Sequence, residues 1–397
     1  MSVPALRFEN FSGSWFEKKL CEIADIKTGP FGSTLHESDY AETGTPIITV
    51  EHLGEQGVVH NNLPLVSDED KTRLKSYNLK QGDIVFSRVG SVDRSCLISD
   101  KENGWLFSGR LLRVRLSDIN FCSIFLNQIF KNETVKYRIR SVAVGQTMAS
   151  LNTEILKNFS LVFPSSKPEQ TKIANFLTAV DEKITLLTQK HDLLTQYKKG
   201  VMQQIFSQEL RFKDNDGQDF ADWELSSLED MEKESLLELG RGNVISKTDI
   251  DKIKGAFPIY SSSVRNYGLF GHYGLFMFDE ELITWSIDGG GDFFYRKKHK
   301  FSVTNVSGFL RITSEKINCK FLSYQLIHLH KKLSFDYQTK AHPSVIRSLY
   351  VVQIPAVEEQ VKIANFLSAI DDKITATLTQ LQAVKQYKQG LLQQMFV

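Results

Sequence analysis

Two stretches of the chain repeat the same hydrophobic pattern. Apolar positions recur in alternating steps of four and three over residues 170–206, and the pattern returns over residues 360–396. Such sustained spacing is typical of a coiled-coil seam. At 1.5 Å per residue, each stretch predicts a helix of ~55 Å. The predicted seam positions are Ile173, Leu177, Val180, Ile184, Leu194 and Val201 in the first stretch, and Ile363, Leu367, Ile370, Ile374, Leu381 and Leu391 in the second.

The two stretches are also copies of each other in sequence. At a constant offset of 190 residues, 19 of the 37 aligned positions are identical. Ser166 and Glu169 have the spacing of a capping box before the first copy, and Pro355 precedes the second. Lys198 and Lys388 occupy matching seam positions. A polar residue in a seam is expected to set the register of the pairing.

Neither predicted helix can bury its apolar stripe alone. Each helix could pack on the globular domain that precedes it, or the two could pack on each other along their length. The length of the repeat and the polar outer faces favour mutual packing. The sequence therefore predicts two helices packed as a coiled coil, which would act as a spacer between the other parts of the chain.

A strand-rich segment precedes each helix. Short β-branched and aromatic runs broken by Gly, Asn and Asp predict strands and turns, whereas residues 121–130 and 321–330 predict helices. The acidic segment 207–222 is rich in Asn, Asp and Gly, which is typical of a linker or of a surface loop. We expect an α+β chain with two mixed α/β globular domains and a pseudo-two-fold internal repeat. Its parts are a globular domain (1–163), a helix (164–208), a second globular domain (209–354) and a C-terminal helix (355–397).

Charge and cysteine content narrow the class of protein. The chain has 48 Lys and Arg against 47 Asp and Glu, so any nucleic-acid binding must come from local basic patches. Its four cysteines form no C-x-x-C pair, and no run of ~18 apolar residues occurs. We therefore expect a cytoplasmic protein without structural zinc, disulfides or a membrane span.

The sequence carries no motif that points to catalysis. It has no G-x-x-x-x-G-K-[ST] phosphate loop and no H-E-x-x-H zinc motif, and none of its nine prolines follows Asn or Asp, as an amino-methyltransferase loop would require. The run from Asp288 to Asp292 encloses three glycines, which is more typical of a turn than of a metal-binding loop. We expect a protein that catalyses no reaction itself and holds no metal.

Three longer motifs give the sequence a specific resemblance. They are GDIVFSRVGSV at 82–92, LFSGRLLRVRL at 106–116 and AVGQTMASLN at 143–152. Together with the two Trp-x4-Leu openings, the two I-A-N-F-L helices and the Q-Q-x-F endings, they resemble the specificity subunit of type I restriction-modification systems over residues 15–397. One departure lies at 340–344, where K-A-H-P-S stands in place of a glycine that the family often has.

The resemblance implies a role in DNA recognition. In that family, two unlike target recognition domains each read half of a split, asymmetric site in double-stranded DNA. The two similar helices pack antiparallel and join these domains to two methyltransferase subunits, and some complexes add two ATP-dependent restriction subunits. S-adenosylmethionine, ATP and Mg²⁺ would then bind the partner subunits and not this chain. Two half-sites give a longer sequence to discriminate, since each mismatch costs ~1–3 kcal/mol.

Candidate DNA contacts lie in loops and basic clusters of both globular domains. Arg and Lys bind phosphates and guanine, and Gln matches the major-groove edge of adenine. The basic cluster at 296–300 could equally be a solvated surface, and the turn at Gly90 could be purely structural. The first-domain candidates are Gly29, Phe31, Ser33, Arg88, Ser91, Arg94, Gln146 and Thr147. The second-domain candidates are Ser262, Ser263, Arg265, Asn266, Arg296, Lys297, Lys298, Lys300, Lys340 and His342.

Two other functions fit parts of the pattern. A stand-alone DNA endonuclease with two similar halves would need a metal-binding acidic cluster in each half. A coiled-coil scaffold would use its globular domains to bind other proteins. Co-purification with a methyltransferase, together with a methylated sequence motif, would favour a specificity subunit over both.

Overall fold

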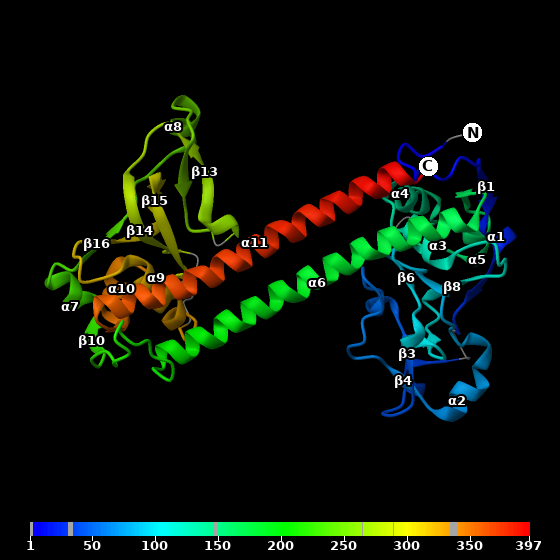
Figure 1. Ribbon diagram of the computed structural model, residues 1–397, viewed down its shortest axis with the longest axis horizontal. Helices are drawn as coiled ribbons and strands as arrows, with labels where there is room; N and C mark the ends of the chain where they lie inside the picture. Colours follow the sequence, from blue (N-terminus) through cyan, green and yellow to red (C-terminus); the bar gives the residue numbers. More distant parts are fainter. Residues whose placement is uncertain (1–2, 31–34, 146–148, 264, 289, 334–339) are drawn as a thin grey trace. The chain divides into compact units, whose positions relative to one another are not determined.

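The computed structural model describes residues 3–30, 35–145, 149–263, 265–288, 290–333 and 340–397. It divides into two units, each with one globular domain and part of each long helix (Figure 1). Unit 1 comprises Met1–Lys190 and Thr377–Val397, and unit 2 comprises His191–Ala376. In the described part of the chain, every helix is too short or too polar to span a bilayer.

The two predicted long helices are present as α6 (Lys167–Phe206) and α11 (Val357–Met395) (Figure 1). In unit 1 the beginning of α6 packs on the end of α11, and Leu177 and Leu391 belong to one hydrophobic core. In unit 2 the order is reversed, because the end of α6 packs on the beginning of α11. The helices therefore run antiparallel, and the predicted coiled coil is confirmed.

Most of the predicted seam residues are buried. Near each globular domain, seam residues pack on the core of that domain as well as on the partner helix, so both packing modes that the pattern allows occur together. Farther along α6 in unit 1, the contact narrows to a small cluster of Ile184, Leu187 and Leu381. The buried seam residues are Ile173, Leu177, Ile184, Val201, Ile363, Leu367, Ile370, Leu381 and Leu391, and the half-buried ones are Val180, Leu194 and Ile374.

A matching ion pair joins the two helices in each unit. Lys388 Nζ lies 2.5 Å from Asp181 Oδ1 in unit 1, and Lys198 Nζ lies 2.6 Å from Asp371 Oδ1 in unit 2. The offset of 190 residues relates both lysines and both aspartates, so these are two copies of one interaction. Each lysine occupies its seam position because it reaches a carboxylate on the facing helix, and the two pairs together fix the register.

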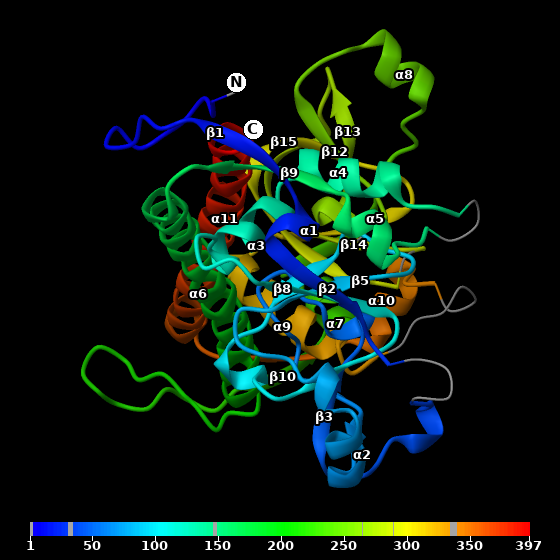
Figure 2. The ribbon, with the colours of Figure 1, turned by 90° about the vertical axis from the view of Figure 1, so that its right-hand side faces the viewer.

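The globular domain of unit 1 is built on an antiparallel sheet with the strand order β2-β8-β5-β6. Figure 2 shows β2, β8 and β5 beside one another. The main core lies between this sheet, α3 and the adjoining ends of α6 and α11. A smaller sheet, β4-β3-β7, and the β1–β9 pair complete the domain.

The elements of this domain are short. The strands are β1 (Trp15–Lys19), β2 (Ala24–Thr28), β3 (Thr45–Ile48), β4 (Leu65–Val66), β5 (Ile84–Ser87), β6 (Ser95–Leu97), β7 (Leu106–Phe107), β8 (Leu111–Leu116) and β9 (Ser160–Pro164). The α-helices are α1 (Leu20–Ile23), α2 (Asp68–Arg73), α3 (Ser123–Phe130), α4 (Glu133–Val142) and α5 (Thr153–Lys157). The 3-10 turns are η2 (Glu37–Asp39), η3 (Val50–His52), η4 (Lys75–Tyr77) and η5 (Asp100–Glu102).

The globular domain of unit 2 has a different, six-stranded sheet with the order β11-β16-β14-β15-β12-β13. Its core packs Trp285 and Leu310 of the sheet on Leu322 of α9. The strands are β10 (Glu224–Ser227), β11 (Leu237–Arg241), β12 (Phe257–Tyr260), β13 (Leu269–Tyr273), β14 (Phe278–Ser286), β15 (Phe293–Val303), β16 (Ser307–Ile312) and β17 (Val351–Ile354). The α-helices are α7 (Leu228–Lys233), α8 (Lys247–Lys252), α9 (Cys319–His330) and α10 (Pro343–Leu349), and η6 (Arg265–Gly268) is a turn with left-handed backbone angles at its centre. Thus α3 and α9 are the helices predicted at 121–130 and 321–330.

A buried carboxylate fixes the entry of α6 into unit 1. Glu169 is 1% exposed and accepts two hydrogen bonds from the guanidinium of Arg7, at 2.6 and 2.7 Å. The indole Nε1 of Trp15 donates a third, at 3.3 Å. A buried carboxylate is costly unless it is paired and hydrogen-bonded, and the bidentate guanidinium supplies both conditions.

The same arrangement recurs at the entry of α11 in unit 2. Glu359 accepts bonds from Arg211 at 2.9 and 2.8 Å and from the indole of Trp223 at 3.1 Å. Both arginines belong to a short repeat, Leu-Arg-Phe, at 6–8 and at 210–212. Part of the segment predicted as a linker or surface loop is therefore an anchor of the second helix.

We predict that Asp181→Ala destabilises the chain more than Asp371→Ala. Asp181 is largely buried and accepts bonds from Lys388 and Lys131. Gln128 donates a third bond to it, at 2.9 Å. Its removal leaves two cations without their partner, which should lower the free energy of unfolding by about 3 kcal/mol. Asp371 is 37% exposed and accepts from Lys198 and from the Tyr324 hydroxyl, so its removal should cost less, about 1–2 kcal/mol. Denaturant unfolding of the full chain measures both.

The pH dependence of this difference provides the control. Burial by itself would raise the pKa of Asp181, but the neighbouring lysines and Gln128 outweigh it and hold that pKa below its usual value. The contribution of Asp181 is therefore complete above the unfolded-state pKa of about 3.9 and is lost as the pH falls through the lower folded-state value. A destabilisation by Asp181→Ala that is as large at about pH 2 as at pH 7 contradicts this account.

Candidate nucleic-acid interface

The turn after β5 brings the three resemblance motifs together. The N–H of Arg88 donates to the carbonyl of Arg110 at 2.8 Å. The N–H of Gly90 donates to Ala149 at 2.8 Å, and the N–H of Leu151 donates back to Arg88 at 2.8 Å. Residues of 82–92, 106–116 and 143–152 thus meet at one place, although they are far apart in sequence.

Several cationic and polar groups surround this turn. Ser91 and Arg94 are exposed, and the guanidinium of Arg94 donates to the carbonyl of Leu53. Arg88 is half-buried and donates to the Thr28 hydroxyl at 3.4 Å, so it supports the turn more than it faces solvent. Arg110 is exposed at the same place, and the sequence reasoning did not single it out.

Gly29 lies beside this turn, at the end of β2. A Cβ at this position would overlap the carbonyl oxygen of Ser108, so only glycine allows the two backbones to approach this closely. The adjoining hollow has a volume of about 610 Å³ and is lined by residues that include Pro30, Tyr40, His52, Asn62, Ser108 and Arg110. The candidates Phe31, Ser33, Gln146 and Thr147 lie outside the described residues.

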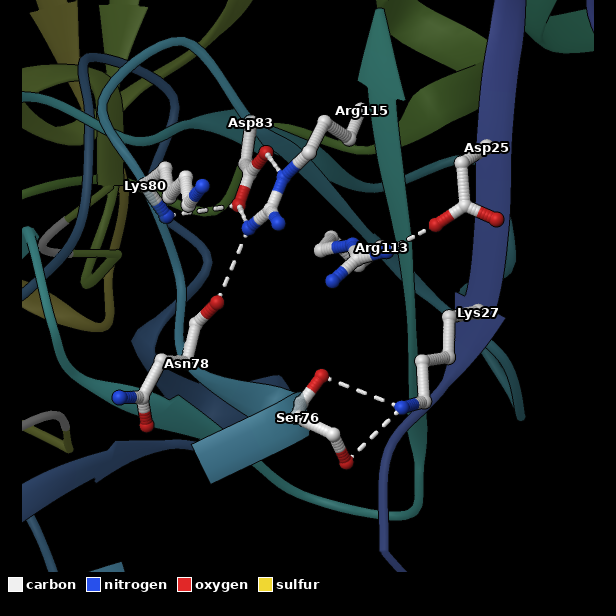
Figure 3. A network of polar contacts seen from close by, with 8 residues as sticks. All are labelled: Asp25, Lys27, Ser76, Asn78, Lys80, Asp83, Arg113 and Arg115. Atoms are coloured by element: carbon white, nitrogen blue, oxygen red, sulfur yellow. Dashed lines mark hydrogen bonds and ion pairs between the residues drawn. The ribbon is translucent and has the colours of Figure 1, made fainter. Parts of the chain in front are cut away.

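A charged network covers one face of the first-domain sheet (Figure 3). Asp25 pairs with Arg115 in the strand register, and Lys27 pairs with Arg113, so these four side chains share a face. Arg115 donates to both oxygens of Asp83, at 2.7 and 2.6 Å. Arg113 forms an ion pair with Asp25. The alternation of arginine with apolar residues over 112–116 is the sequence signal for this charged face.

This network places three cations against two carboxylates. Arg113 is 3% exposed, and burial, followed by repulsion from Arg115, lowers the pKa of its guanidinium. Lys27 Nζ donates to the carbonyl and hydroxyl of Ser76 at 3.1 and 3.0 Å, and burial lowers the pKa of its amine. The strands involved lead directly into Gly29 and Arg110. The network therefore stiffens the part of the sheet that supports the candidate interface. It also gives this part of the sheet a positive electrostatic potential.

In the second domain, the predicted basic cluster at 296–300 is only partly exposed. Lys297, Lys298 and Lys300 are exposed on β15. Arg296 is not: it is 6% exposed, its Cζ lies 3.7 Å from the ring centroid of Tyr260, and its Nε donates to Thr284 at 3.0 Å. Arg296 is therefore not part of the exposed basic surface that the run predicts, because this position of the strand points inward, and its contact with DNA stays a prediction.

The serine-rich candidates lie in the hairpin loop between β12 and β13. The loop is closed by a bond from Ser261 N to the carbonyl of Gly268, at 2.8 Å. The carbonyl of Ser262 accepts from the Ser286 hydroxyl at 2.8 Å. Ser263 and Asn266 are exposed, and Arg265 begins η6. These candidates therefore share one loop at an edge of the sheet.

Local structure accounts for the last two candidates. Lys340 Nζ lies 2.9 Å from Asp288 Oδ1, and the ring of His342 accepts from the N–H of Ser344 as the N-cap of α10. These contacts are local to the domain, and a DNA contact of either residue stays a prediction. Among the described residues, no group of three or more His, Cys, Asp or Glu side chains is placed to hold a metal ion.

Sequence comparison relates the chain to known proteins. The family model described as type I restriction modification DNA specificity domain matches residues 13–196 and 221–386. The putative type I restriction enzyme MjaX specificity subunit of Methanocaldococcus jannaschii is 24% identical over 373 residues, which are 88% of this chain and 85% of that protein. The type I restriction enzyme MpnII specificity subunit of Mycoplasma pneumoniae is 30% identical over 146 residues, which are 36% of this chain and 44% of that protein.

Structure comparison gives the same result for the fold. The S subunit of a type I restriction-modification system from M. genitalium matches with a TM-score of 0.69 and 17% identity, over 100% of this chain and 99% of that one. The family model matches twice, on each globular domain and the long helix that follows it, in agreement with the internal repeat. The resemblance seen in the sequence is confirmed. The chain therefore belongs to the type I restriction-modification DNA specificity family, as a specificity subunit.

Proposed function

We propose that this subunit reads a bipartite, asymmetric sequence in double-stranded DNA, one half with each globular domain, and directs methyltransferase subunits to it. The observation that carries the proposal is that the same helical framework is repeated in both units, although their globular domains differ. The antiparallel helices, the buried carboxylate anchor and the cross-helix ion pair recur in both units. The sheets differ in strand number and order. Two unlike readers on a repeated frame suit a split site with unlike halves.

The exposed groups of both domains support DNA as the ligand. Arg94 and Arg110 stand at the first-domain turn, and three exposed lysines stand on β15 of the second domain. Such groups provide the phosphate contacts that position a protein on a duplex, while loops beside them read base edges. A chain with a net charge of +1 thus presents local positive surfaces to DNA.

The repeated helices also carry a repeated outer face, which we propose as the docking surface for methyltransferase subunits. Tyr197 and Tyr387 stand at matching positions and are 53% and 56% exposed. Gly200 and Gly390 also match, and a Cβ on either would meet no described atom within 4 Å. Glycine inside a helix costs about 1 kcal/mol relative to alanine. The packing of this chain therefore gives no reason for a glycine at both positions.

A partner that approaches the helix closely does give a reason. Glycine lets another chain come within contact of the helix backbone, and tyrosine commonly anchors protein interfaces. Because the same residues occur in both repeats, the same partner would bind twice, so we propose two methyltransferase subunits per chain. In unit 2 this face borders a groove of about 630 Å³, whose lining includes Tyr197, Gly200, Gln203, Gln204, His328 and Lys332.

The chemistry of the complex would reside in the partners. S-adenosylmethionine would bind the methyltransferase subunits, and ATP and Mg²⁺ would bind ATP-dependent restriction subunits where a complex contains them. The sequence of this chain has neither the amino-methyltransferase loop nor the phosphate loop that these reactions use. Its own contribution is to choose the DNA site and to hold the partners there.

We predict that Gly200→Ala and Gly390→Ala each raise the thermal stability of the isolated chain and each remove one methyltransferase subunit from the complex. Alanine favours the helix, while its methyl group fills the space that the partner needs. Native mass spectrometry of the co-purified complex should show two methyltransferase subunits for the wild type, one for either variant and none for the double variant. Thr195→Ala changes an exposed residue on the opposite side of α6 from Tyr197 and should leave two bound. Two methyltransferase subunits on both glycine variants would rule out this docking surface.

We also predict that the helices set the gap between the half-sites. Seven residues inserted after Thr185 in α6 and after Val384 in α11 keep the seam pattern and lengthen both helices by ~10 Å, about three base pairs. Single-molecule sequencing of DNA from cells that express the subunit with its methyltransferase should show the same two half-sites with a gap longer by about three base pairs. An unchanged gap contradicts the spacer role. A wild-type complex that methylates no split motif contradicts the proposed function.

A further inference from the structure

The hairpin loop of the second domain contains an unusual backbone conformation. Three consecutive residues, Asn266, Tyr267 and Gly268, have φ angles of 49°, 52° and 79°. Glycine adopts such angles without strain and asparagine tolerates them, but a bulky residue such as tyrosine does not. A strained residue persists only where the surrounding structure over-determines it, and such residues cluster at functional sites. Tyr267 is therefore held in place for a reason that local preference does not supply.

Burial does not supply the reason either. The side chain of Tyr267 is 75% exposed, so its ring adds little to the packing of the domain. Other exposed aromatic and basic groups follow along the same hairpin and the neighbouring strand. Phe270 on β13 is exposed, and at the far end of the hairpin the exposed Phe276 packs on Phe257, with Lys300 Nζ 4.7 Å from its ring centroid. Exposed rings interleaved with lysines are typical of surfaces that bind nucleic acids.

A buried cation lies directly beneath the loop. Arg296 Nη2 would lie 3.1 Å from a Cβ on Gly268, which places the guanidinium against the end of the turn. Its Cζ stacks over the ring of Tyr260, the last residue before the loop. Among the described residues, no carboxylate forms an ion pair with this guanidinium. Burial lowers the pKa of Arg296 to about 10, so it keeps its positive charge at neutral pH.

The rings of Tyr260 and Phe294 and the hydroxyl of Thr284 offset part of the cost of burying this cation, and a ligand of opposite charge at the loop would offset more. A buried cation without a carboxylate destabilises a domain, and a guanidinium at this place adds positive potential to the surface of the turn. A duplex brings phosphates that complement this charge, and its bases offer apolar surface to an exposed ring. Aromatic and apolar side chains that wedge against base steps are a known means of recognising DNA shape and sequence.

We propose that Tyr267 is a specificity-determining residue of the second recognition domain, whose ring packs against a base step of the second half-site, and that Arg296 is the positioning residue that holds the turn beneath it. The inference rests on the proposed function and deepens it, because it names the side chain that reads one half. It also gives a function to the two unfavourable features of the loop. The strained backbone of Tyr267 leaves its ring exposed to the DNA, and the buried charge of Arg296 attracts the phosphates of the duplex.

The test separates binding from folding, since the relevant substitution relieves strain. Tyr267→Gly removes the ring and accommodates the positive φ, so the melting temperature of the full chain should stay the same or rise by a few degrees. In the complex with its methyltransferase, methylation of the genomic motif should fall by at least about tenfold, or the motif should relax at one position of one half only. Tyr267→Phe keeps the ring and should keep the motif. Tyr137→Ala, which removes a similarly exposed tyrosine from α4 of the first domain, should change neither.

Arg296 is tested by the contrast between two replacements. Arg296→Met keeps the apolar packing on Tyr260 but removes the charge, and it should relax the same half of the motif as Tyr267→Gly. Arg296→Lys keeps the charge and should restore at least part of the recognition. A purely structural role would instead lower the melting temperature of the methionine variant and leave the sequence of the motif unchanged.

The outcomes for the inference and for the proposed function are distinct. A wild-type complex that methylates a split motif, together with a Tyr267→Gly complex that methylates the same motif at the same rate, overturns the inference alone. A wild-type complex without a split motif overturns the proposed function and the inference with it.

Discussion

The mutual burial of two long apolar stripes is the constraint on which the rest of the structure depends. Helix α6 continues through 40 residues, and its stripe is longer than a single small domain covers. Helix α11 returns antiparallel and covers it in both units. The ion pairs of Lys198 and Lys388 then select one register, because a shift by one turn would separate both lysines from their aspartates. The buried Arg–Glu–Trp clusters set where each helix joins its domain.

These constraints also explain how an almost neutral chain presents positive surfaces. Many of its carboxylates are paired inside the frame: Glu169 and Glu359 at the helix entries, and Asp181 between the helices. Asp83 is likewise buried against Arg115 in the first-domain sheet. Each of these acids takes a base with it, and exposed lysines such as Lys297, Lys298 and Lys300 on β15 form no ion pair with a carboxylate among the described residues. Local positive potential therefore arises from how the remaining charges are distributed over the surface and not from an overall excess of basic residues.

The two long helices and their pairing could be predicted from the sequence because the same pattern recurs over many residues. Five heptads of regular spacing and a repeat of 37 positions predict the helices and their pairing. The loop geometry could not be predicted in this way. Arg296 belongs to a dense basic run, yet the residues that enclose it, Tyr260 and Thr284, come from two other strands.

Short motifs of a few residues are intermediate, because they are visible in the sequence but their structural role is not. The Leu-Arg-Phe repeat at 6–8 and 210–212 was present in the sequence, but three residues do not stand out until their anchoring role is seen. Arg110 was visible only as part of a longer motif. Its exposure beside the turn at Gly90 depends on a hydrogen bond between segments 22 residues apart, Arg88 and Arg110. Side chains that act through such tertiary contacts leave no periodic trace along the chain.

The glycines at 200 and 390 have a consequence for the fate of the subunit in a cell. Each weakens its helix by about 1 kcal/mol, so a solitary copy forgoes about 2 kcal/mol of stability. A partner present at one hundred times its dissociation constant returns about 2.7 kcal/mol by mass action. An unassembled copy would therefore unfold more often than one bound to its partner. Assembly would in this way regulate the supply of the subunit, and the cellular level of the DNA-reading component would follow that of the component that modifies DNA.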